Sequence, residues 1–220
     1  PKYKGVIEVT KEGDTFILIN EVNVEDYIAG VIPSEMPTSY GIEAAKVQAV
    51  AARTYALAGK RSSKYVLYGA QIDDTTDSQV YNNVPANEVS RKAAKETKGE
   101  ILLSNGHSIS SKFYATSCGY TANFGEVWAS GETFPTNTPV YLVSRQQYLG
   151  DKRVNNMKDE KDAYKFFTLK SSEIDAFDKD SPWFRWQVKL KAKELEALIN
   201  PAVRKLTRNY PALAKALNKD

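Results

Sequence analysis

Two short apolar stretches separated by a polar turn lie at the start of the chain. The apolar stretches 6–9 and 16–19 flank the turn sequence Lys-Glu-Gly-Asp at 11–14. Apolar stretches on both sides of such a turn predict a β-hairpin, with Asn20 at its end. A second hairpin is predicted over 101–114, because an Asn-Gly pair interrupts another apolar run there.

Helical patterns follow the first hairpin. Asn23 is a good N-cap for a short helix over 24–31, which Gly30 and Pro33 are expected to end. The strongest helical pattern covers 42–60, where small apolar residues occupy most of the circumference. Such a helix is expected to be buried on several sides.

The second half of the chain has weaker patterns. A second amphipathic helix is predicted over 85–98, closed by Gly99. The segment 150–162 is too charged to pack and is expected to form an exposed excursion. Alternation over 184–190 predicts a strand, and the prolines that follow predict short, broken helices.

Together these patterns predict an α+β fold, with helices and β-hairpins around one core, an exposed loop excursion and a helical C-terminal part. Residues 1–145 are expected to form the domain core. Residues 146–220 are expected to continue the same domain with the excursion, one strand and the C-terminal helices. At 220 residues and 42% hydrophobic composition, the chain is long enough to bury a real core.

Composition excludes several kinds of site. One cysteine and one histidine cannot form an intrachain disulfide, a CxxC redox pair or an ordinary zinc site. A net charge of +3 with 26% charged residues argues against nucleic acid as a partner. No apolar run is long enough to span a membrane. The chain begins at Pro1 rather than Met, so we expect a processed or cloned fragment whose leader or anchor, if there was one, lay upstream.

Nucleophilic and metal chemistry have weak candidates. His107 is expected at an exposed hairpin tip, and Cys118 has no evident activating partner. The aspartates at 73, 74 and 77 lack the glycine and terminal glutamate of a calcium hand and are expected to satisfy turn amides. No metal and no cofactor are therefore predicted.

Glu35 is the most informative carboxyl group, because Pro33 and Met36 are among its apolar neighbours in the sequence. Partial desolvation there would favour the protonated form that a general acid needs. The alternative is that Glu35 only caps the following helix. On that helix, Lys46 and Arg53 share a stripe, with Glu43 and Lys60, that is either a solvated face or a cationic part of a site.

Two runs resemble the signature of the stage II sporulation protein D family, the SpoIID/LytB domain. They are V-E-D-Y-I-A-G-V-I-P-S-E-M-P at 24–37 and A-A-K-V-Q-A-V-A-A-R-T-Y-A-L at 44–57. The agreement continues in T-T-D-S-Q-V-Y at 75–81, E-T-K-G-E-I-L, F-Y-A-T-S-C-G-Y-T, Val127-Trp128 and, more loosely, S-P-W-F-R-W-Q-V. The resemblance covers roughly residues 3–190.

The resemblance implies a domain that acts on peptidoglycan outside the cytoplasm, in the cell wall or anchored to a membrane. Some members are lytic transglycosylases, which cleave glycan strands between N-acetylmuramic acid and N-acetylglucosamine without water and leave anhydro-muramic ends. Others enhance cell-wall amidases, so a non-catalytic glycan-binding or amidase-enhancing module remains the alternative. A structural cell-wall adaptor is a further rival.

The resemblance also assigns residues. Glu35 matches the catalytic glutamate, and Lys46 and Arg53 match helix residues expected to complete the catalytic site, where they would position acetamido or lactyl groups and tune the pKa of Glu35. The residues expected to line a saccharide groove, or alternatively to pack, are Gln79, Tyr81, Tyr114, Ser117, Thr121 and Trp128.

The sequence also departs from the family pattern. Some relatives look as if they carry a His/Cys cluster near Q-V-Y, but here aspartates and Ser78 stand in its place, so zinc is not carried over. Cys118-Gly119 replaces a pair of glycines. The Gly- and His-rich segment that often closes the domain is missing, which favours the non-catalytic alternative.

Overall fold

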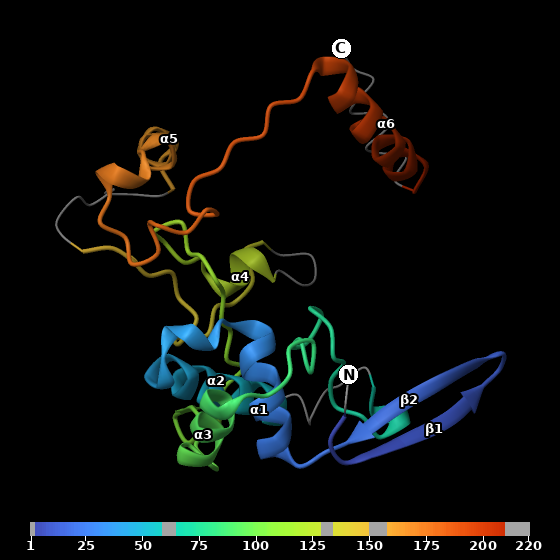
Figure 1. Cartoon of the computed structure of the whole chain (residues 1–220). Coiled ribbons are helices and arrows are strands. Elements are labelled where there is room, and N and C mark those ends of the chain that lie inside the picture. The colour runs from blue at the N-terminus through green and yellow to red at the C-terminus, as the bar shows by residue number, and fades with distance from the viewer. Residues whose placement is uncertain (1–2, 59–64, 129–133, 150–157, 210–220) are drawn as a thin grey trace. The chain divides into compact units, whose positions relative to one another are not determined.

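The computed structural model describes residues 3–58, 65–128, 134–149 and 158–209. It combines α-helices with small antiparallel sheets, which confirms the predicted α+β class (Figure 1). The chain divides into two compact units: unit 1 is Pro1–Ala115 with Pro139–Leu142, and unit 2 is Thr116–Thr138 with Val143–Asp220. The boundary predicted at residue 145 stays a prediction.

The regular elements follow in chain order. Unit 1 contains β1 (Val6–Glu12), β2 (Thr15–Glu21), α1 (Val24–Glu35), η1 (Thr38–Tyr40), α2 (Ile42–Ala58), η3 (Val66–Tyr68), α3 (Glu88–Glu96), β3 (Leu103–Ser104) and β4 (His107–Ser108). Unit 2 contains α4 (Phe124–Val127), α5 (Glu160–Thr168), η4 (Ser171–Glu173) and α6 (Ala192–Asn209).

Both predicted hairpins form. Strands β1 and β2 pair antiparallel with Val9 opposite Leu18 and Glu12 opposite Thr15. The second hairpin is shorter than expected, since β3 and β4 contain two residues each. Its Asn-Gly turn takes positive φ at both positions, 51° at Asn105 and 76° at Gly106, as a tight hairpin turn requires.

Helix α1 begins as predicted but does not end as predicted. The Asn23 side chain accepts the Glu25 N–H at 2.9 Å, which is the expected N-cap. The helix then continues through Gly30 and Pro33 to Glu35, so the predicted end was wrong. Proline costs about 3 kcal/mol inside a helix, but each fully buried Ile or Val contributes about 1.5–3 kcal/mol, and α1 buries three of them, Ile28, Val31 and Ile32.

The core of unit 1 lies between α1, α2 and α3. Helix α2 turns Ala45, Ala49 and Ala52 inward, and α3 contributes Ala93 and Ala94. These small side chains let the three helices approach closely, and the prediction that the alanine-rich helix is buried is confirmed for these positions. The part of its predicted range beyond Ala58 lies outside the described residues.

Unit 2 has a separate apolar cluster, so the residues that the structure describes form two buried clusters, whereas a single core was predicted. Tyr148, Phe166 and Phe184 are buried there, with Ile174 and Ala176. An isolated bridge pairs Tyr148 with Ala176. The cluster therefore joins residues far apart in the sequence, which local patterns do not reveal.

Two further expectations for unit 2 were wrong. The segment 184–190 is not a strand: Phe184 is buried, and the positions that alternate with it are exposed. Helix α6 continues through Pro201 for 18 residues instead of breaking. Residues 150–157 of the predicted excursion and the tail beyond 209 lie outside the described residues.

Candidate functional site

Glu35 is the last residue of α1 and is half-buried. Its Oε1 accepts the backbone N–H of Val80 at 2.6 Å. The carboxyl group lines a cavity of about 470 Å³, here called the Glu35 pocket, whose walls are residues 33–39, Val84 and Asn87. One oxygen of the carboxyl group is thus held by the backbone at the edge of an open pocket.

The Q-V-Y motif lies against α1, and each of its residues makes a different contact. Gln79 Oε1 accepts a hydrogen bond from the Tyr27 hydroxyl at 3.2 Å, while the Val80 N–H donates a hydrogen bond to Glu35 Oε1. The Tyr81 ring packs on the Tyr27 ring with centroids 4.9 Å apart. Gly30 permits this approach, since a Cβ there would lie 2.7 Å from Tyr81 Cε2.

Tyr27 was not singled out by the sequence, and it lies at the centre of this arrangement. Burial raises the pKa of its hydroxyl, and the negative charge of Glu35 raises it further. The Tyr27 hydroxyl is therefore a neutral hydrogen-bond donor at any physiological pH. Its position in V-E-D-Y, eight residues before Glu35, was the available signal.

A second, larger cavity of about 960 Å³ lies in unit 1. Val80 and Tyr81 line it, together with Tyr3, Lys4, Asp26, Gly30, Asp74, Thr75, Asn82, Asn83, Pro85, Ala86 and Arg91. The segment 80–87 contributes to both cavities, and Val84 N–H donates to Ser34 Oγ at 3.1 Å. This segment is thus fixed to the C-terminal end of α1.

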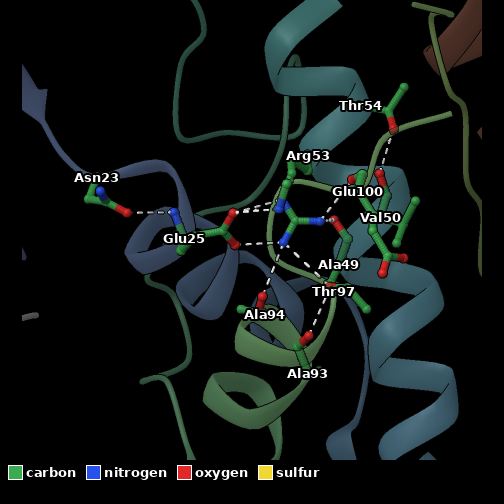
Figure 2. A network of polar contacts seen from close by, with 11 residues as sticks. Asn23, Glu25, Ala49, Val50, Arg53, Thr54, Ala93, Ala94, Thr97 and Glu100 are labelled. Carbon is green, nitrogen blue, oxygen red and sulfur yellow. Dashed lines mark hydrogen bonds and ion pairs between the residues drawn. The ribbon is translucent and has the colours of Figure 1, made fainter. Parts of the chain in front are cut away.

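Arg53 does not face Glu35. Its side chain is 1% exposed and forms a two-pronged ion pair with Glu25, with Nε to Oε1 at 3.1 Å and Nη2 to Oε2 at 2.6 Å (Figure 2). The guanidinium also donates to the carbonyl oxygens of Glu100 at 3.0 Å and Ala94 at 3.3 Å. Glu25 lies ten residues before Glu35, about 15 Å along the helix axis.

Lys46 also has other partners. Its Nζ lies 2.9 Å from a carboxylate oxygen of Glu96 and 2.9 Å from one of Glu43. These hydrogen bonds raise the pKa of Lys46 and help lower that of Glu96. The expected cationic stripe beside Glu35 is thus divided between two sets of acidic partners, and Lys60 lies outside the described residues.

The predicted saccharide-binding residues are divided between the two units. Gln79 and Tyr81 are buried beside α1, 1% and 8% exposed, whereas Tyr114 is exposed in the same unit. The other three lie in unit 2. There Ser117 donates to Asp178 from its N–H and its hydroxyl, Thr121 Oγ1 accepts the Arg145 N–H at 2.8 Å, and Trp128 stacks on Phe124 at 5.2 Å.

Asp73 behaves as a turn residue. Its carboxylate accepts the Thr75 N–H at 2.9 Å and the Tyr65 hydroxyl at 2.5 Å. Burial works against the charged form, but hydrogen bonds from Thr75, Tyr65 and Ser78 outweigh it and lower the pKa of Asp73 to about 2. Within the described residues, no group of acidic, histidine or cysteine side chains could hold a metal ion.

His107 and Cys118 were the two side chains considered for nucleophilic chemistry. His107 is exposed in β4, at the tip of the second hairpin. Cys118 is a half-buried free thiol with a φ of 56°. None of the helices that the structure describes has the length and apolar character of a membrane span.

Comparison with known proteins shows a family that part of the chain resembles. The family model described as "SpoIID: Stage II sporulation protein" matches residues 12–103, the part of unit 1 that holds α1, α2, α3 and Glu35. Over 103 residues, 47% of this chain and 14% of the relative, the chain is 41% identical to "Amidase enhancer" of Bacillus subtilis (strain 168).

Two further relatives are named "Stage II sporulation protein D". The Bacillus subtilis (strain 168) protein is 35% identical over 126 residues, 51% of this chain and 37% of the relative. The Bacillus amyloliquefaciens protein is 31% identical over 149 residues, 58% of this chain and 43% of the relative. The chain spans less than half the length of each of these relatives. The similarity to the SpoIID family, the stage II sporulation protein family, thus covers the segment from 12 to 103.

Proposed function

We propose that this protein acts on the bacterial cell wall outside the cytoplasm and cleaves peptidoglycan glycan strands between N-acetylmuramic acid and N-acetylglucosamine. The cleavage is non-hydrolytic and leaves anhydro-muramic ends. Glu35 serves as both acid and base. The family and the names of the relatives support a cell-wall role, and the geometry around Glu35 supports this reaction.

One observation carries the proposal: Glu35 is the only ionisable side chain among the described residues that line its pocket. A hydrolytic glycosidase ordinarily needs two carboxyl groups, about 5–9.5 Å apart, one of them to act as nucleophile or to activate water. A transglycosylase needs one, because the attacking hydroxyl belongs to the substrate. A pocket with a single carboxyl group fits the second mechanism.

The reaction balances with Glu35 alone. The protonated carboxyl group gives its proton to the glycosidic oxygen as the bond from C1 of the muramic sugar breaks. The resulting carboxylate accepts the proton of that sugar's own C6 hydroxyl, whose oxygen bonds to C1 and closes the anhydro ring. Glu35 ends protonated, as it began, and no water is consumed.

The test compares the parent with Glu35→Gln, which keeps the size of the side chain and removes the acid. Purified protein is incubated with sacculi, with and without stem peptides, and the products are analysed by mass spectrometry. We expect anhydro-muramic ends from the parent and none above background from Glu35→Gln. Equal product from both variants would refute the catalytic role, and reducing ends without the anhydro ring would indicate hydrolysis instead.

A second candidate is favoured by the relative named "Amidase enhancer". In this reading the domain binds glycan strands and increases the activity of a cell-wall amidase without cleaving glycan itself. The exposed apolar face of the first hairpin, with Val9, Phe16 and Leu18, offers a surface for such a partner. The proteins it works with would then be a cell-wall amidase and other cell-wall proteins.

The two candidates differ in a measurable way. Enhancement predicts sacculus binding without anhydro-muramic products, and release of stem peptides that increases only when a purified cell-wall amidase is added. It also predicts that Glu35→Gln enhances as well as the parent. If the parent makes anhydro-muramic products without an added amidase, and Glu35→Gln does not, the transglycosylase is favoured instead.

A further inference from the structure

The resemblance to the family led us to expect Gln79 and Tyr81 at the saccharide. The structure gives them other surroundings. The Gln79 side chain is 1% exposed and lines neither of the two cavities described above, while Tyr81 is 8% exposed beneath the larger one. A glycan strand is a bulky polymer that meets the surface, so a buried Gln79 does not reach it in this arrangement.

What Gln79 does contact is α1. Tyr27 and Glu35 lie two helical turns apart on this helix, about 12 Å along its axis. The Gln79–Val80 dipeptide spans that interval: Gln79 Oε1 accepts the Tyr27 hydroxyl at 3.2 Å, and the next residue donates its N–H to Glu35 Oε1 at 2.6 Å. The chain is thus held at Gln79, immediately before the amide that meets the carboxyl group.

We infer that Tyr27 and Gln79 are positioning residues, which fix the Val80 N–H on Glu35 Oε1 and so leave Oε2 as the oxygen that carries the transferable proton. An N–H donor on Oε1 disfavours protonation of that oxygen. The other oxygen then gives its proton to the glycosidic oxygen and accepts one from the C6 hydroxyl. This inference rests on the proposed function for its catalytic consequence, but the positioning itself can be tested separately.

A cost in the core supports this interpretation. The Gln79 Nε2 is buried and has no hydrogen-bond partner within the described part of the chain. A buried unsatisfied donor costs about 1–3 kcal/mol, so the amide nitrogen of Gln79 opposes folding, and among the described residues only the amide oxygen has a partner. The presence of Gln79 at this position is better explained by the hydrogen bond between its amide oxygen and the Tyr27 hydroxyl than by a contribution to folding stability.

The experiment uses near-isosteric variants of the full chain: Tyr27→Phe, Gln79→Met and the double variant. Tyr68→Phe is the matched control, because this hydroxyl donates to the exposed Glu12 in the same unit. Amide hydrogen exchange of Val80 reports the positioning directly. We expect about tenfold faster exchange in each of the three variants, as a locally loosened amide shows, and no change in Tyr68→Phe.

Kinetics on a soluble glycan oligosaccharide test the consequence. We expect kcat to fall about tenfold in each single variant with KM unchanged, because neither residue touches substrate. The double variant separates positioning from stability. Replacing both partners with apolar groups is nearly neutral for folding, so its Tm should return close to that of the parent while kcat stays low.

The outcomes test the positioning role and the proposed function separately. Val80 exchange that is unchanged in Tyr27→Phe and Gln79→Met overturns the positioning role whatever the activity. Recovery of kcat together with Tm in the double variant also overturns it, since the residues would then matter only for folding. A parent that makes no anhydro-muramic product, with faster Val80 exchange in the variants, overturns the proposed function and leaves the positioning of Glu35 supported.

Discussion

Replacement of Arg53 by Met should destabilise the protein strongly. The guanidinium is 1% exposed, and Glu25 forms two of its hydrogen bonds. Arg53→Met would leave the Glu25 carboxylate without its cation in a mostly buried position and would remove a donor from the carbonyl oxygens of Ala94 and Glu100. Breaking one side of a buried ion pair costs about 3–5 kcal/mol, and we expect a loss in that range.

Lys46→Met is the matched control, because Lys46 is on the same helix and also pairs with carboxylates. Its partners Glu43 and Glu96 are exposed, and exposed pairs contribute about 0–1 kcal/mol. Urea denaturation followed by far-ultraviolet circular dichroism measures both variants. The expected signature is a large shift of the midpoint for Arg53→Met and a small one for Lys46→Met, with the slope unchanged.

The double variant Glu25→Leu/Arg53→Met tests whether Arg53→Met destabilises the protein because Glu25 is left without its cation or because the ion pair itself is lost. Well-packed apolar residues often replace a buried ion pair without loss of stability, so we expect it to recover much of what Arg53→Met loses. If Arg53→Met costs less than about 1 kcal/mol, the ion pair does not hold unit 1 together and the reasoning fails. Arg53 would then again be a candidate for direct chemistry.

Two further predictions concern other contacts of unit 1. Gly30→Ala should lower the free energy of unfolding by about 1–2 kcal/mol, because a Cβ would lie 2.7 Å from the buried Tyr81 ring; greater stability in urea would contradict this close packing. Asp73 has its pKa lowered from 3.8 to about 2, so its stabilisation is present above pH 3.8 and is lost as the pH falls through these two values. Asp73→Asn should therefore be less stable at neutral pH, by about 1 kcal/mol, and lose less stability between pH 4 and pH 2 in acid titrations; a slope equal to that of the parent would contradict the assignment.

Local signals in the sequence predicted the elements that depend on local chemistry. The Asn23 cap and the Asn105-Gly106 turn act over two or three residues, and both appear as predicted. Pro33 shows where local rules fail, because the burial of the surrounding face of α1 outweighs the hydrogen bond that proline removes. The strand expected over 184–190 fails for a similar reason: alternation is present, but no neighbouring strand pairs with it in the described structure.

The candidate site was predictable only in part. Glu35 is marked by its residue type and its motif, whereas the Val80 N–H that meets it has no side-chain signature. The spacing of Lys46 and Arg53 correctly places them on α2, but spacing does not say which carboxylate each one meets. Glu25 lies 28 residues from Arg53 in the sequence, and only the packing of α1 against α2 brings the two together.

The two ends of α1 explain how motif residues can be important without touching substrate. At the N-terminal end, Arg53 ties Glu25 to α2 and to the last turn of α3. At the C-terminal end, Val80 meets Glu35. Arg53 can therefore affect Glu35 only by holding the helix that carries it. Lost activity in an Arg53 variant would not by itself place Arg53 at the glycan; that conclusion would require a lower kcat at unchanged stability.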